Sequence, residues 1–170
     1  GLSVEELNAK FEISDPVRYL YFDQGEGGLI RANLKFSASK AQIYLFGAHI
    51  TSFQVYSTEM LFVSKEAIFN GVKAIRGGIP LVFPQFASNG PLPQHGFART
   101  AMWSVKSGRL FSEQEREGVE LVLSLDRTPE MAGLWAQDFE ADLVVKLYGR
   151  NELETTLCVR NTSGSGETLS

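Results

Sequence analysis

Hydrophobic and polar residues alternate with a period of two along several stretches of the chain. In residues 30–36, apolar side chains occupy every second position, and polar or charged ones lie between them. Such alternation is typical of a β-strand that buries one face and wets the other. The same pattern predicts strands over residues 41–46, 118–126, 139–148 and 153–159.

Helical signals are few. Ser3 and Glu6 match a capping box, in which each side chain satisfies a backbone amide at a helix start, so a helix is predicted over residues 3–11. Residues 127–137 predict one further helical turn. Many short strands with few helices predict an all-β fold, a sandwich or barrel of mainly antiparallel strands. We interpret residues 1–170 as a single β-sandwich domain.

The carboxyl end has the composition of a loop. Residues 161–170 are rich in Ser, Gly and Thr, and the sequence stops at Ser170, where another strand could begin. We therefore expect a sandwich that is incomplete at this end. An incomplete sandwich exposes edge strands and an apolar face, which favours self-association or pairing with a missing second segment.

Composition and charge narrow the classes of function. The chain is 44% hydrophobic and 21% charged with a net charge of −4, and its lysines and arginines are scattered. This distribution argues against nucleic acid as a partner. No apolar run approaches the roughly 18 residues of a membrane span, and the first residues lack the apolar centre of a signal peptide. We therefore expect a cytoplasmic protein without a membrane partner.

The two histidines and the single cysteine do not predict a metal site. None lies at a ligand spacing from another, so the sequence favours neither a zinc pattern nor a disulfide framework. Cys158 falls in an alternating run, and we expect it to be a buried, reduced thiol. His49 lies in a stretch that predicts a strand entering the core, which favours a hydrogen-bonded structural imidazole.

The alternation breaks down between residues 72 and 99. This segment holds four of the six prolines and also four glycines, so its backbone is irregular. Binding residues tend to lie in such segments when a rigid scaffold carries them. Arg76 precedes Gly77 and Gly78, which lack Cβ atoms and let main-chain amides approach a ligand.

A second polar cluster follows closely. Gln94, His95 and Arg99 place an amide, an imidazole and a guanidinium within six residues. A guanidinium holds phosphate or neighbouring sugar oxygens in two places, an amide donates to one hydroxyl and accepts from the next, and an imidazole exchanges a proton near neutral pH. Together these groups suit a phosphorylated sugar. The alternative is structural: Arg76 and Arg99 pair with carboxylates, and His95 fills a partly buried gap.

Four stretches are the most distinctive, namely YLFGAHITSF (44–53), MLFVSKEAIF (60–69), KAIRGGIPLVFPQF (73–86) and PQHGFARTAMW (93–103). They resemble the glucose-6-phosphate 1-epimerase family, the hexose-6-phosphate mutarotase branch of the aldose 1-epimerase-like proteins. The most specific part of this resemblance is RGGIP followed by QHGFAR. The resemblance runs from about Leu29 to about Asn161.

The resemblance implies a fold, an activity and a set of site residues. It implies a large antiparallel β-sandwich of the galactose mutarotase type, an isomerase that interconverts the α and β anomers of glucose 6-phosphate, and no metal or organic cofactor. By position in the matching motifs, Arg76, Gln94 and Arg99 resemble substrate-binding residues. His95 resembles a neighbouring histidine that contacts the sugar and has an auxiliary catalytic role. The family's principal acid and base, a histidine and a glutamate, match no residue here.

Three functions stay open on these grounds. Opening a pyranose ring requires a base at the C1 hydroxyl and an acid at the ring oxygen. The first function is therefore a hexose-6-phosphate mutarotase that acts by acid–base ring opening. The others are a non-catalytic sugar-phosphate binding domain and an aldose 1-epimerase that acts on neutral sugars. In each case the expected partner is a small sugar or sugar phosphate.

Overall fold

Strands dominate the part of the chain that the computed structural model describes, residues 1–164, 166, 168 and 169. The elements in chain order are α1 (Val4–Phe11), β1 (Ile13–Ser14), β2 (Arg18–Gln24), the one-turn 3-10 helix η1 (Glu26–Gly28), β3 (Ile30–Phe36), β4 (Ser39–Tyr44), β5 (His49–Val55), β6 (Thr58–Glu59), the one-turn 3-10 helix η2 (Ala98–Thr100), β7 (Trp103–Glu113), β8 (Arg116–Leu125), α2 (Pro129–Leu134), β9 (Phe139–Tyr148) and β10 (Glu152–Asn161).

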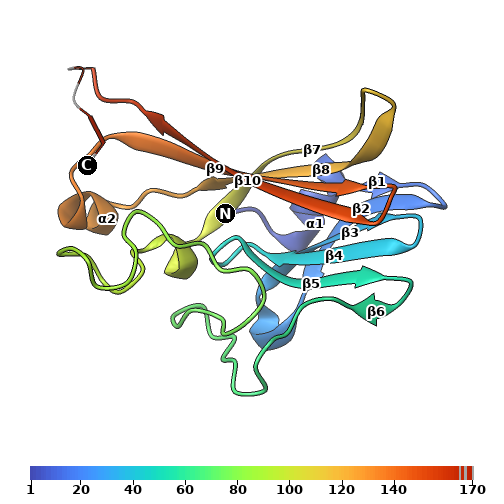
Figure 1. The fold of residues 1–170 in the computed structure, drawn as a ribbon, viewed down its shortest axis with the longest axis horizontal. Helices are drawn as coiled ribbons and strands as arrows, with labels where there is room; N and C mark the ends of the chain where they lie inside the picture. The colour runs from blue at the N-terminus through green and yellow to red at the C-terminus, as the bar shows by residue number, and fades with distance from the viewer. Residues whose placement is uncertain (165, 167, 170) are drawn as a thin grey trace.

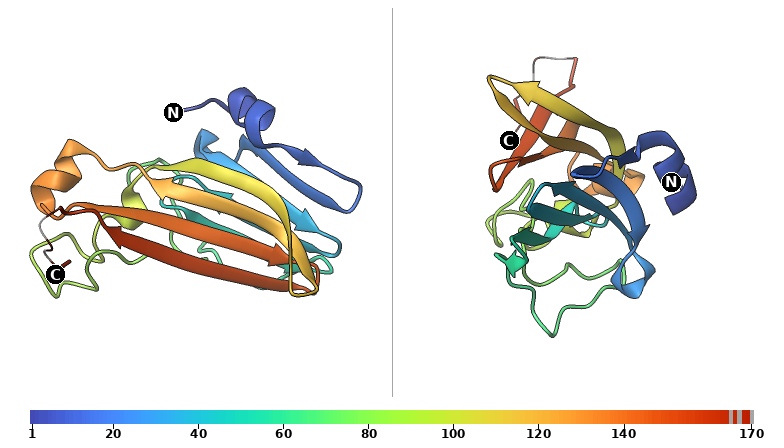
Figure 2. Two further views of the ribbon diagram at one scale, coloured as in Figure 1. Left: turned by 90° about the horizontal axis from the view of Figure 1, so that it is seen from above. Right: turned by 90° about the vertical axis from the view of Figure 1, so that its right-hand side faces the viewer.

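The strands form two sheets that pack against each other (Figure 1). One sheet has six strands in the order β1-β2-β3-β4-β5-β6, and the other has four in the order β10-β9-β8-β7. Neighbouring strands are antiparallel in both sheets. Figure 2 shows the two layers from above and from the side. The prediction of an antiparallel β-sandwich is confirmed.

A shared apolar core lies between the sheets. At its centre are side chains of both sheets that are at most 1% exposed: Leu20, Leu34, Ile43, Leu121 and Leu143. Each lies on a different strand and points to the inner face of its sheet, where every second side chain of the strand also points. The alternation in the sequence therefore identified the faces that the two sheets turn toward each other.

The amino-terminal helix has the predicted cap and is tied to the first sheet. The Ser3 hydroxyl accepts from the Glu6 amide at 3.2 Å, and the Glu6 carboxylate accepts from the Ser3 amide at 3.3 Å. The Asn8 side chain bonds both main-chain polar groups of Phe22, at 2.7 and 2.9 Å. The predicted turn at 127–137 is present as α2. Neither helix of the described residues is long and apolar enough to cross a bilayer.

Two features of the second sheet differ from the sequence predictions. Cys158 is exposed, although we expected it to be buried. In the edge strand β10, Leu153 and Leu157 pack against the core. Cys158 directly follows Leu157, so its side chain points to the opposite face of the sheet. Strand β7 was not predicted at all, because its register shifts between Val105 and Ser107 and this bulge breaks the alternation.

Truncation of a core side chain tests the packing of the two sheets. Leu143→Ala should lower the free energy of unfolding by about 2–5 kcal/mol, because it removes buried methyl groups and leaves a cavity. Thr155→Ala in the neighbouring strand β10 is the control, since Thr155 is exposed. Urea unfolding followed by the fluorescence of buried Trp103 measures both changes. Equal effects of the two substitutions would contradict the assignment of the core.

Candidate functional site

Residues 60–97 form irregular loops between β6 and η2, and Figure 1 shows them in green beside the first sheet. A second, smaller apolar cluster packs the first half of these loops against the sheet. It contains the buried side chains Tyr44, Phe46 and Ile75, and the ring of Phe69 lies 5.2 Å from that of Tyr44. Buried Ile75 therefore anchors the loop and holds the next residue, Arg76, at the surface.

Main-chain hydrogen bonds fix the turn that follows Arg76. The Gly78 amide donates to the Phe62 carbonyl at 2.7 Å, and the Ile79 amide donates to the Ile50 carbonyl at 2.9 Å. Gly78 has a φ of 60°, and a Cβ atom there would collide with the Ile50 carbonyl oxygen. This position accommodates only glycine without strain, because the backbone is left-handed and closely packed.

The imidazole of His49 holds the same turn from inside the protein. His49 is fully buried at the start of β5, and its Nε2 lies 2.5 Å from the carbonyl oxygen of Gly77. A carbonyl oxygen only accepts, so Nε2 carries the proton and donates it. Burial lowers the pKa of this imidazole, an effect that the bond to Gly77 partly offsets. The prediction of a hydrogen-bonded structural histidine is confirmed. The partner of His49 is the Gly77 carbonyl, in the turn that follows Arg76.

Arg99 lies in the short helix η2. A hydrogen bond and a close backbone approach fix the position of this helix. The indole Nε1 of Trp103 donates to the Ala98 carbonyl at 3.0 Å in the interior. Gly47 has a φ of 74°, and a Cβ atom there would lie 2.6 Å from the Arg99 carbonyl oxygen. Gly47 lies in the connection between β4 and β5, and His49 is the first residue of β5. This corner of the first sheet therefore supports both arginine-bearing segments.

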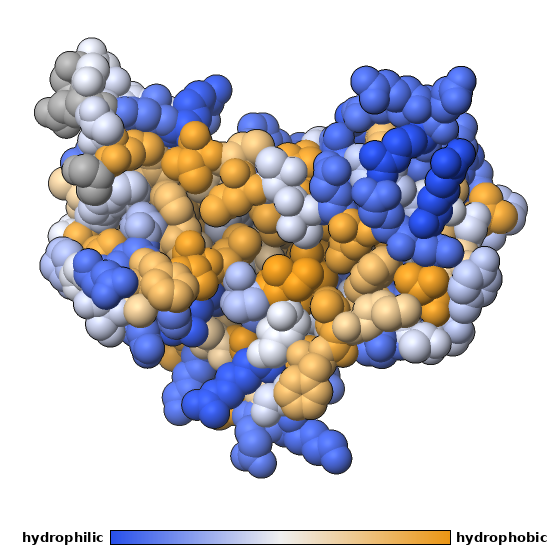
Figure 3. Space-filling model, viewed as in Figure 1, coloured by the Kyte–Doolittle hydropathy of each residue, from blue (hydrophilic) through white to orange (hydrophobic). Residues whose placement is uncertain are grey.

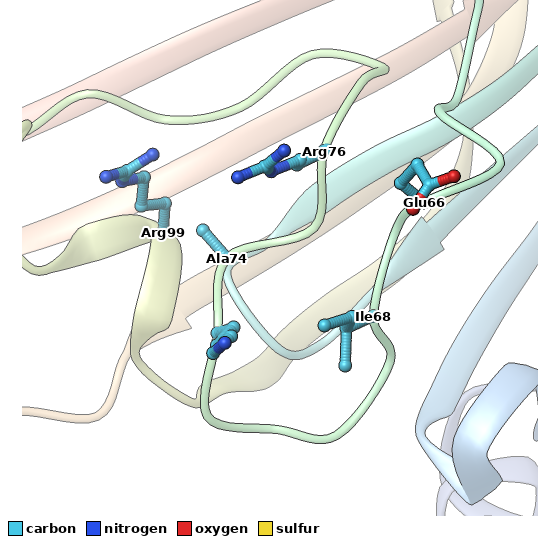
Figure 4. A pocket seen from close by; sticks show the side chains of 6 residues that line it. Glu66, Ile68, Ala74, Arg76 and Arg99 are labelled. Atoms are coloured by element: carbon cyan, nitrogen blue, oxygen red, sulfur yellow. The ribbon is translucent and has the colours of Figure 1, made fainter.

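Arg76 and Arg99 line one cavity of about 370 Å³, which is within the range of about 300–1,000 Å³ typical of small-molecule sites. Figure 4 shows the Arg76 guanidinium pointing toward the side on which Arg99 lies, with Glu66 on the other side. The remaining lining residues are Ile68, Lys73 and Ala74. Sequence reasoning missed Glu66 and Lys73, because single charged residues in loops carry no periodic signal.

The cavity wall is positively charged. Lys73, Arg76 and Arg99 face it together with one carboxylate, Glu66, which leaves a formal charge of +2, whereas the whole chain carries −4. Within the described part of the chain, none of these four side chains forms an ion pair. The arginines are therefore not neutralised by carboxylates, which was the structural alternative. The wall suits an anion and lacks the donor set of a metal site.

Gln94 and His95 lie beside this cavity and do not line it. The Arg99 guanidinium donates to the main-chain carbonyl of Gln94 at 3.1 Å, and the Gln94 side chain is exposed. The His95 Nδ1 accepts from the Ala87 amide at 3.1 Å, and its ring packs edge-on against Phe86. The structure therefore brings Arg76 and Arg99 together, while His95 turns toward the neighbouring loop.

The surface around the loops is partly apolar. Figure 3 shows hydrophobic side chains in the hollowed middle of this face and hydrophilic ones around its edge. In residues 60–97, Phe62, Val72 and Phe86 are 76%, 71% and 68% exposed. Exposed apolar side chains that gather on one face commonly mark a surface for another molecule or segment. The positive charge of the cavity is thus a local feature in loops of mixed polarity.

The sequence matches a known family over most of its length. The model of the aldose 1-epimerase family matches residues 31–169. A relative from Cenchrus ciliaris is 39% identical over 134 residues, which cover 76% of this chain and 40% of the relative. A relative from Escherichia coli K12 is 37% identical over 139 residues, covering 75% and 46%. Both are named "Putative glucose-6-phosphate 1-epimerase". The chain spans less than half of the length of these relatives.

Solved structures share the architecture. A "putative mutarotase" from Salmonella typhimurium superposes with a TM-score of 0.64 at 28% identity, over 81% of this chain and 45% of that one. A galactose mutarotase-like protein from Clostridium acetobutylicum gives a TM-score of 0.64 at 17% identity, over 88% and 51%, and shows the fold alone. The expectation of a galactose mutarotase-like sandwich is confirmed.

The buried histidine predicts a pH dependence of stability. Its folded pKa lies below the unfolded value of about 6.5, so below that pH the unfolded chain binds more protons. The free energy of unfolding should therefore fall as the pH drops from about 7.5 through 6.5, by at most about 1.4 kcal/mol per unit for one proton. His49→Gln should flatten this slope in urea titrations. An unchanged slope would show that His49 is not its source.

The turn after Arg76 predicts a position-specific glycine effect. Gly78→Ala should destabilise the protein by more than about 1 kcal/mol, because the new Cβ meets the Ile50 carbonyl in a left-handed backbone. Gly133→Ala is the control, since Gly133 lies in α2 with open space around it. That change should be neutral or stabilise by up to about 1 kcal/mol. Thermal unfolding of the two variants measures the difference, and equal effects would contradict the geometry of the turn.

Proposed function

Because the chain belongs to the aldose 1-epimerase family, we propose that it provides the phosphate-binding part of a hexose-6-phosphate mutarotase that acts on glucose 6-phosphate. The names of the curated relatives support this substrate, and the observation that carries the proposal is the unpaired positive cavity. We further propose that the protein acts in the cytoplasm, as expected from its sequence.

The charge of the cavity matches a phosphate ester. A phosphate monoester carries about −1.5 to −2 at neutral pH, and the lining residues carry a formal +2. A guanidinium binds two oxygens through parallel hydrogen bonds, so Arg76 and Arg99 together can hold the phosphoryl group from two sides. In this arrangement the phosphate anchors the sugar, and the ring extends toward the neighbouring loops.

The arrangement also defines what these residues contribute to the reaction. Ring opening needs one group to take the C1 hydroxyl proton and another to protonate the ring oxygen. Arg76 and Arg99 stay protonated at physiological pH, so they bind and orient the substrate. With Nδ1 occupied by the Ala87 amide, neutral His95 has its proton on Nε2, which can donate to a sugar oxygen. His95 therefore has an auxiliary role in this proposal, as Gln94 has in contacting the sugar.

A second candidate function is a sugar-phosphate binding domain without catalysis. One observation favours it: among the described residues that line the cavity, Glu66 is the one carboxylate, and there is no histidine. An acid–base pair is therefore not assembled on this wall. The two functions differ in whether bound glucose 6-phosphate exchanges its anomers faster than in water.

Removal of one arginine tests the proposal. Arg76→Met should weaken the binding of glucose 6-phosphate about 10- to 100-fold, the range expected for a lost charge-assisted contact, and leave the binding of free glucose unchanged. The Arg76 side chain is exposed and forms no ion pair with any residue that the structure describes, so the fold should survive the change. Arg150→Met, in the exposed turn between β9 and β10, is the matched control. Calorimetric titration measures both sugars.

Anomer exchange, followed by NMR on the same samples, separates the candidate functions. Accelerated exchange of glucose 6-phosphate that Arg76→Met slows is the result expected for the mutarotase. Tight binding without acceleration would favour the non-catalytic domain. Equal affinity for glucose and glucose 6-phosphate would instead favour an enzyme of neutral sugars and contradict the proposal.

A further inference from the structure

Lys73 is the third cation on the wall of the cavity, and its main chain is firmly placed. The side-chain oxygen of Asn70 accepts from the amides of Val72 and Lys73, at 2.9 and 3.0 Å. Ile75, two residues later, is buried in the second apolar cluster. The backbone of Lys73 is thus held between a hydrogen-bonded turn and a buried anchor, three residues before Arg76.

The ammonium group of Lys73 is available to a ligand. Within the residues that the structure describes, it takes part in no ion pair and no side-chain hydrogen bond, although Glu66 lines the same cavity. Lysine is a compact point charge on a flexible stem, whereas arginine is a planar fork. A lysine can therefore follow a third oxygen of an anion that two guanidinium groups already hold.

We propose that Lys73 is a specificity-determining residue that makes the cavity select a doubly charged phosphate ester over a singly charged sulfate ester. This inference rests on the proposed function, in which the cavity holds the phosphate of a hexose 6-phosphate. The two esters are tetrahedral and similar in size, so the arginine forks fit both. What distinguishes the esters is mainly one unit of charge.

The balance of charge on the wall gives the reason. The two arginines alone would match a dianion, but Glu66 cancels one of their charges and leaves +1, which suits a singly charged sulfate ester. Lys73 restores the wall to +2, which suits a phosphate ester at neutral pH. At the short distances inside one cavity, a unit of charge changes the binding energy of an anion even with solvent access.

Titrations with two ligands test this role. The unchanged protein, Lys73→Met and Lys73→Arg are titrated with glucose 6-phosphate and glucose 6-sulfate at about pH 7.5, above the phosphate pKa of about 6. Lys73→Met should weaken phosphate binding roughly three- to tenfold and sulfate binding less, which reduces the preference for phosphate. Lys73→Arg should retain most of the preference. Lys65→Met is the matched control, because Lys65 is an exposed neighbour that does not line the cavity.

The outcomes distinguish this inference from the proposed function on which it rests. If Lys73→Met and Lys65→Met have the same phosphate-to-sulfate ratio while Arg76→Met loses binding, the role of Lys73 is wrong and the phosphate cavity stands. If the unchanged protein binds neither ester, both proposals are wrong. If Lys73→Met weakens the two esters equally, Lys73 contributes affinity without specificity, which also overturns the inference. Unfolding curves of each variant verify that the compared proteins are folded.

Discussion

The hydrogen bond from the buried imidazole of His49 to the Gly77 carbonyl joins the first sheet to the turn that carries Arg76. A buried Nε2 donor left unpaired would cost the free energy of its lost hydration, so this bond holds the turn against the sheet. Gly47, two residues before His49, lets the backbone of η2 approach closely and thereby positions Arg99. The β4–β5 connection and the first residue of β5 therefore align two separate segments of the chain.

The arginines of the strands and those of the cavity differ in their partners. Arg31 pairs with Asp23 and Arg109 pairs with Glu120, which are contacts between neighbouring strands. Within the described residues, Arg76, Arg99 and Lys73 line one cavity without such partners. Like charges that share a wall repel, and a bound anion relieves that repulsion. The cavity wall thus carries unpaired positive charge on an acidic chain, as a site for an anion requires.

The sandwich and the cavity carry different kinds of information about function. The same architecture occurs in solved structures at 28% and at 17% identity, so it identifies the scaffold and leaves the substrate open. In the function proposed above, selectivity depends on the charges of Glu66, Lys73, Arg76 and Arg99, which line the cavity. These loops are irregular but anchored, since Ile75 and Trp103 tie them to buried clusters. A rigid scaffold with polar loops is a common arrangement in binding proteins.

The sequence by itself determined most of the longer strands, the capped helix and the irregular segment that carries the two arginines, because periodicity and turn residues are local properties. It missed β7, whose bulge breaks the alternation. It did not reveal that Cys158 faces outward, since burial at the edge of a sheet depends on which strands lie beside it. Nor did it place Lys73 and Glu66 with the arginines or turn His95 away from them. Those arrangements depend on contacts between loops, above all at Gly47 and His49, and only the folded chain brings these contacts together.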